Sequence, residues 1–128
     1  MKNIVALCLL SGIFVAACRK SEGQGGTSTI QGKIFIQDYN SSGNLQSVYF
    51  APDEDVYLIY GQDSVFGERT RTSYQGLYRF EGLQPGDYQV YAYSKCSNCP
   101  SAVSATILSV NIPNKGEFLE VSTITLTK

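Results

Sequence analysis

Apolar and polar residues alternate along most of the chain beyond residue 28, with the two-residue period of strands that bury one face. The clearest alternation covers residues 76–90, where two such segments flank Pro85 and Gly86. Pro fixes φ and Gly tolerates a positive φ, so this pair predicts a tight turn between two strands. Further strands are predicted at residues 30–36, 46–50, 56–60, 68–72, 103–112 and 118–127. About seven short strands, with no helical period after the N-terminus, predict an all-β antiparallel sandwich.

The apolar positions of these strands predict one hydrophobic core. Its expected members are Ile34, Ile36, Val56, Leu58, Tyr78, Phe80, Leu83, Tyr88 and Val90. A length of 128 residues allows one domain, and 43% apolar residues with nine Tyr and six Phe can fill its interior. The net charge of −1 gives no reason to expect a nucleic-acid partner.

The residues around the predicted turn also carry a resemblance to a known family. Residues 76–90 read G-x-Y-x-F-x-G-L-x-P-G-x-Y-x-V. This pattern resembles the central signature of carboxypeptidase regulatory-like and collagen-adhesin B-type domains, and residues 30–34 and 55–60 look like earlier strands of that family. The resemblance implies a transthyretin-like (prealbumin-like) β-sandwich in a non-catalytic module. Enzymes of this fold that act in purine breakdown rely on His, and this chain contains none.

The N-terminal residues are typical of a targeting segment. A basic start at Lys2 precedes an apolar run at residues 4–17, which is short for a membrane-spanning helix. Residues 15–18, Val-Ala-Ala-Cys, resemble the bacterial lipobox. That resemblance implies cleavage before Cys18 and a lipid on its sulfur, although an ordinary secretory signal is the alternative. Arg19 in place of Asp favours sorting to the outer membrane of the bacterial cell envelope.

These features predict three segments. Residues 1–17 are expected to be the signal peptide, and residues 18–27 the lipidated Cys followed by a flexible tether, because Gly and Ser are frequent there. Residues 28–128 are expected to be the sandwich domain.

Two cysteines remain in the predicted domain, in the sequence Cys96-Ser97-Asn98-Cys99. In an oxidising envelope we expect a disulfide between Cys96 and Cys99. A redox-active dithiol or half of a zinc site is the alternative. Redox dithiols owe much of their activation to a helix N-terminus, which is not expected here. Zinc needs four ligands, and the predicted domain has no other Cys and no His.

Two further groups of residues carry weaker signals. Asp53, Glu54 and Asp55 offer oxygen ligands suited to calcium, but their spacing matches no calcium loop and a solvated acidic loop is expected. Lys33 occupies the position from which some members of the resembled family form an isopeptide cross-link. It alternates with apolar Ile34, so it is expected to point to solvent.

Three tyrosines are expected on the outer faces of their strands, because Tyr57, Tyr91 and Tyr93 alternate with predicted core residues. They are the candidate binding surface for a sugar or a protein, with ordinary cross-strand packing as the alternative.

No catalytic residue, metal or cofactor is expected. The sequence therefore predicts a non-catalytic envelope lipoprotein, anchored in the membrane by lipid, whose domain binds or spaces a partner. A carbohydrate- or peptide-binding module and an adhesin-like structural subunit are the alternatives.

Overall fold

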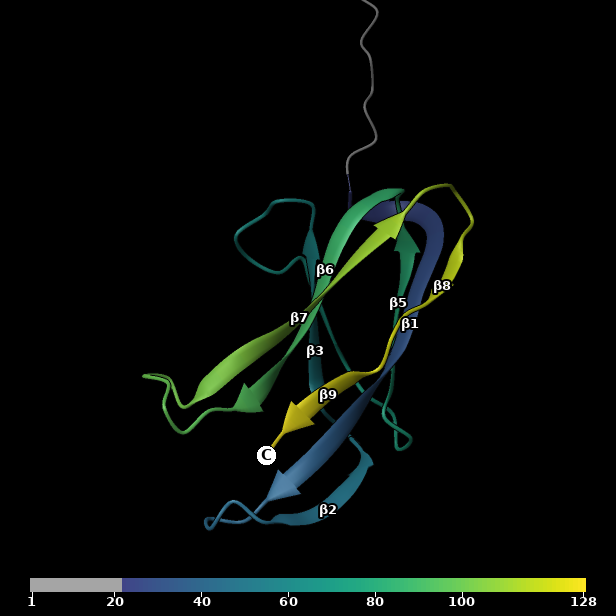
Figure 1. Cartoon of the computed structure of the whole chain (residues 1–128). Coiled ribbons are helices and arrows are strands. Elements are labelled where there is room, and N and C mark those ends of the chain that lie inside the picture. Colours follow the sequence, from purple (N-terminus) through teal and green to yellow (C-terminus); the bar gives the residue numbers. More distant parts are fainter. Residues whose placement is uncertain (1–21) are drawn as a thin grey trace, which may run out of the picture.

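The computed structural model describes residues 22–128, and within that range the chain forms nine strands and no helix (Figure 1). The strands are β1 (Gln24–Tyr39), β2 (Leu45–Phe50), β3 (Asp55–Tyr60), β4 (Glu68–Arg71), β5 (Leu77–Leu83), β6 (Gly86–Lys95), β7 (Val103–Ile112), β8 (Phe118–Glu120) and β9 (Ile124–Thr127). They make a five-stranded sheet around β1 and a four-stranded sheet in the order β4-β3-β6-β7. The predicted all-β sandwich is confirmed.

The first sheet is organised by β1, whose 16 residues are long enough to pair with different strands along their length. On one edge its first part pairs with β5 and its last part with β2, both antiparallel. On the other edge β8 and then β9 run parallel to it. The prediction of one C-terminal strand in an all-antiparallel sandwich is therefore wrong in this sheet. Alternation in sequence reports burial but not strand direction, so it could not reveal parallel pairing.

The second sheet is antiparallel throughout, and its outer face is the candidate binding surface. Its edge strand β4 is short and charged, with Glu68, Arg69 and Arg71 in four residues. Charges on an edge discourage pairing with another chain.

The core lies between the two sheets, and all nine predicted core residues are buried. Residues from β7 and β9 complete it, among them Ile112 and Leu126. The predicted turn is also confirmed, since β5 ends at Leu83, β6 begins at Gly86, and Gly86 has a φ of 143°. A non-glycine residue would be strained in this conformation.

The N-terminal end of β1 differs from the prediction of a flexible tether up to residue 27. Strand β1 begins at Gln24, so residues 24–27 belong to the sheet. A β-carbon on Gly26 would overlap the carbonyl oxygen of Leu83. Glycine therefore serves close packing here rather than flexibility, a distinction that composition alone does not make. Residues 18–21, the rest of the predicted tether, and the predicted signal peptide lie outside the described residues.

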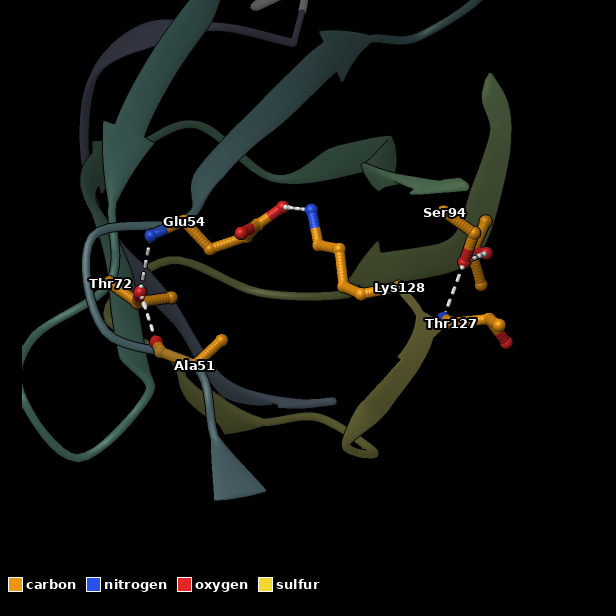
Figure 2. A network of polar contacts seen from close by, with 7 residues as sticks. Ala51, Glu54, Thr72, Ser94, Thr127 and Lys128 are labelled. Carbon is orange, nitrogen blue, oxygen red and sulfur yellow. Dashed lines mark hydrogen bonds and ion pairs between the residues drawn. The ribbon is translucent and has the colours of Figure 1, made fainter. Parts of the chain in front are cut away.

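Polar contacts join the two sheets near the C-terminus (Figure 2). The Thr127 N–H of β9 donates to Ser94 Oγ of β6 at 3.0 Å, and Lys128 Nζ lies 2.8 Å from Glu54 Oε1. The backbone N–H of Glu54 donates in turn to Thr72 Oγ1 at 2.8 Å, and the Thr72 hydroxyl donates to the Ala51 carbonyl. These contacts fix the loop before β3 against the last strand.

Lys33 is exposed, as expected, and its Nζ lies 5.2 Å from the centroid of the Phe50 ring. Within residues 22–128, no helix has the length and hydropathy needed to cross a membrane.

Candidate binding surface

The structure brings the three predicted tyrosines together on the outer face of the second sheet. Tyr57 of β3 is opposite Tyr91 of β6, and Tyr93 follows two residues later on the same face. Their sequence neighbours point the other way, into the core: Val56, Leu58, Val90 and Ala92 are each 0% exposed. The strand period places the tyrosines on one face, and the β3–β6 register makes them neighbours.

The rings form one compact cluster. Tyr57 and Tyr91 stack with centroids 4.9 Å apart and an interplanar angle of 13°. Tyr93 meets both of them edge-on, with centroid distances of 5.6 Å to each. Phe66 packs edge-on against Tyr57 at 4.9 Å from the loop between β3 and β4. We call Tyr57, Phe66, Tyr91 and Tyr93 the aromatic cluster.

Sequence reasoning missed Phe66, which lies in a segment predicted only as a loop. Its neighbour Val65 is 72% exposed and Phe66 itself 46% exposed. Two consecutive apolar residues in an otherwise polar loop were the available signal, because a loop without a contact has little reason to carry them.

The packing of the cluster determines which parts of it a ligand can reach. Tyr57 and Tyr91 are half-buried, and each covers one ring face of the other by stacking. Tyr93, in contrast, is 39% exposed. Ile107, opposite Tyr91 on β7, is 55% exposed. Burial and the hydrogen bond with Tyr93 raise the pKa of Tyr91 to about 12. The accessible part of this surface therefore consists of Tyr93 and Phe66 of the aromatic cluster, together with the neighbouring Ile107.

A polar hollow adjoins the aromatic cluster on strands β6 and β7. The outward residues of β6 change from Tyr93 and Tyr91 to Gln89 and Asp87, and their β7 partners change from Ala105 and Ile107 to Ser109 and Asn111. The hollow has a volume of about 270 Å³, and its lining includes Gly61, Gln62, Asp87, Gln89, Ser109 and Asn111.

The Asp87 and Asn111 side chains in the hollow are already oriented by each other. Asn111 Nδ2 donates to Asp87 Oδ1 at 2.8 Å. A carboxylate has further acceptor capacity, and the Asn111 amide keeps a carbonyl oxygen and a second N–H. This pair can therefore accept hydrogen bonds from, and donate one to, hydroxyl groups of a small ligand.

Charged side chains flank the cluster on the β4 side. Arg69 is exposed opposite Tyr57, and Arg71 Nε lies 3.0 Å from Asp55 Oδ1. Of the three acidic residues weighed above as calcium ligands, Asp55 thus pairs with Arg71 and Glu54 with Lys128. Among residues 22–128 there is no group of three or more His, Cys, Asp or Glu placed to hold a metal ion.

The predicted disulfide is present between Cys96 and Cys99, with Cα atoms 5.4 Å apart, in the loop that joins β6 to β7. The Cys96 N–H donates to the Ala102 carbonyl at 2.9 Å, and the Ala102 N–H donates to the Cys99 carbonyl at 3.0 Å. With both sulfurs in the disulfide, neither is available to a zinc ion. The predicted lipidation site, Cys18, lies outside the described residues.

Comparison with known proteins gives a partial match in sequence and a fuller one in fold. No family model matches the chain. Colossin-A of Dictyostelium discoideum is 34% identical over 80 residues, which cover 62% of this chain but 1% of Colossin-A. The chain thus corresponds to a very small part of that protein.

Among solved structures, the fold resembles the crystal structure of "a putative carbohydrate binding protein" from Pseudomonas aeruginosa. The TM-score is 0.50 at 15% sequence identity, covering 83% of this chain and 91% of the other. Similarity at this identity shows a shared β-sandwich fold.

Proposed function

We propose that this protein is a non-catalytic binding module of the bacterial cell envelope and that it binds carbohydrate on the outer face of the β4-β3-β6-β7 sheet. The observation that carries the proposal is the continuity of the aromatic cluster with the polar hollow on strands β6 and β7. Sugars have apolar C–H patches and hydroxyl groups, so they fit a surface that offers aromatic side chains beside paired polar ones.

Different parts of this surface bind different parts of the sugar. Tyr93 and Phe66 supply aromatic contact, and the Asp87–Asn111 pair binds hydroxyl groups in the hollow. The volume of about 270 Å³ lies just below the range of about 300–1,000 Å³ that is usual for drug-sized ligands. It is suited to a single sugar unit, with further units extending along β6 toward Tyr93.

The fold neighbour supports this choice of ligand, because it is a candidate carbohydrate-binding protein with the same architecture. We further propose that the chain is a transthyretin-like domain of the carboxypeptidase regulatory-like kind. Residues 76–90 support that assignment, and their Tyr and Phe positions face the core while their Pro-Gly pair makes the turn.

The proposed place of action is the outer membrane, to which a lipid on Cys18 anchors the protein. The lipobox-like sequence at residues 15–18 supports it. A non-catalytic role is supported by the absence of His from the whole sequence, since His is the side chain most often used as general base. Metabolic labelling with palmitate tests the anchor: wild type should incorporate label, and Cys18→Ala should not.

Screening the purified protein on a glycan array, followed by titration calorimetry with the best glycan, tests the carbohydrate proposal. Tyr93→Ala and Asp87→Ala should each weaken binding at least several-fold while the fold is retained. Tyr74→Ala is the matched control, because Tyr74 is 94% exposed in the loop between β4 and β5 and is not a member of the aromatic cluster. Absence of any glycan bound, or equal loss with Tyr74→Ala, would contradict the proposal.

A protein partner is the second candidate, and the ring packing favours it. Tyr57 and Tyr91 stack on each other, so the cluster offers mainly ring edges and apolar side chains such as Ile107. Such a surface is also suited to an adhesin-like or structural contact with another envelope protein. Cross-linking in intact cells that is lost with Ile107→Asp, with no glycan bound, would favour this candidate.

A further inference from the structure

The N-terminal end of the described chain is fastened to one end of the sandwich. The Gly23 N–H donates to Tyr88 Oη at 2.9 Å, the Tyr88 hydroxyl donates to the Gln84 carbonyl at 2.6 Å, and the Gln84 N–H donates to the Gly23 carbonyl at 2.8 Å. Glu22 Oε1 accepts a longer hydrogen bond of 3.4 Å from the Asp87 N–H. Residues 22–23 are thus held against the turn between β5 and β6.

Other loops meet at the same end, which we call the N-terminal pole. The Gly61 N–H donates to the Asp87 carbonyl at 2.8 Å, which adds the loop after β3. Ser28 Oγ donates to the Asn114 carbonyl at 3.2 Å and accepts from the Glu117 N–H at 3.1 Å, which adds the loop between β7 and β8. The loop between β1 and β2 lies at the opposite end, which we call the distal pole (Figure 1).

This fastening shortens the connection between the domain and the proposed lipid. Three residues separate Cys18 from Glu22, so the two Cα atoms are at most about 14 Å apart even when the chain is fully extended. The ten residues of β6 run for about 33 Å between the poles. The connection is therefore much shorter than the domain, so it limits how far the domain can move or turn.

We infer that the membrane surface is a partner of the N-terminal pole: the domain is held with this pole next to the phospholipid headgroups and the distal pole directed away from them. The inference rests on the lipid anchor proposed above. It also orients the binding surface relative to the membrane. The polar hollow, lined by Gly61 and Asp87, lies near the membrane, and the β6–β7 loop with the disulfide is farther from it.

The charge of the pole indicates that covalent attachment, and not adhesion, keeps it near the membrane. Glu22, Asp87 and Glu117 outnumber Lys115 there. Anionic lipids attract basic segments, so this pole has no electrostatic reason to adhere to them. Lengthening the connection should therefore release the domain from the surface.

The test uses the full-length lipidated protein in vesicles of phosphatidylethanolamine and phosphatidylglycerol that contain headgroup-spin-labelled lipid. A fluorophore is attached at Lys115→Cys on the N-terminal pole or at Ser42→Cys on the distal pole; both positions are exposed. The disulfide-bonded cysteines do not react with the label. Quenching should be several-fold stronger at position 115 than at position 42. A long Gly/Ser insertion between residues 21 and 22 should remove the difference, and Tyr88→Phe should reduce it.

The outcomes distinguish the inference from the proposal on which it rests. Failure of the protein to float with the vesicles would overturn the lipid anchor and the inference with it. Flotation with equal quenching at the two positions, or with stronger quenching at position 42, would overturn the inference alone. A difference that persists with the long insertion would show that adhesion holds the pole at the membrane and would also overturn it.

Discussion

Two buried tyrosines should respond in opposite ways to the same loss of one hydroxyl group. Tyr88 and Tyr78 are each 1% exposed. The Tyr88 hydroxyl accepts a hydrogen bond from the Gly23 N–H at 2.9 Å and donates one to the Gln84 carbonyl at 2.6 Å. The Tyr78 hydroxyl has no partner among the described residues and lies next to Gly32.

The magnitudes follow from what each substitution leaves behind. Tyr88→Phe leaves the Gly23 N–H, which is buried, without its partner, and it removes a second hydrogen bond. An unsatisfied buried donor costs about 1–3 kcal/mol, so we expect a loss of about 2 kcal/mol or more in the free energy of unfolding. Tyr78→Phe instead removes a polar group whose burial is not compensated by a protein hydrogen bond, and should stabilise by about 1 kcal/mol.

Urea unfolding followed by far-ultraviolet circular dichroism measures both values under the same conditions, with linear extrapolation to water. Each ring is retained in these substitutions, so changes in packing are small and the difference of about 3 kcal/mol reports the hydroxyl groups. Equal destabilisation by the two substitutions, or a loss of more than about 1 kcal/mol for Tyr78→Phe, would refute this assignment of hydrogen bonds.

Three further outcomes follow from the same structure. Phe80→Ala should destabilise the domain by about 3–5 kcal/mol in the same urea assay, because Phe80 is 2% exposed in the core; a loss below about 1 kcal/mol would contradict that burial. Gly86→Val should lower the thermal midpoint, since Gly86 has a φ of 143° and a side chain there would meet Glu22; an unchanged midpoint would contradict the turn. Burial raises the pKa of Tyr78 above its usual value of 10.0, so the unfolded state releases this proton first and stability should fall as the pH rises above about 10. Tyr78→Phe should make that fall less steep, and an identical pH profile of the two proteins would contradict it.

The sequence by itself determined the parts of this protein that depend on local periodicity. The two-residue alternation identified nine of the buried positions, from Ile34 to Val90, because a strand cannot move a residue to its other face without moving all its neighbours. The Pro85-Gly86 turn and the Cys96–Cys99 disulfide were also predictable, since each depends on residues close together in the chain.

Only the tertiary structure decided how the strands pair and which surfaces result. The same alternation fits parallel and antiparallel neighbours, so the parallel pairing of β8 and β9 with β1 had no local signal. The glycines at residues 25–26 suggested a linker, yet contact with the β5–β6 turn makes them part of β1. The tyrosines of the candidate binding surface were identified as outward-facing, but their stacking, the contribution of Phe66 and the adjoining hollow depend on the register between strands distant in sequence. That register is set by packing of the whole core, which no single segment of the sequence contains.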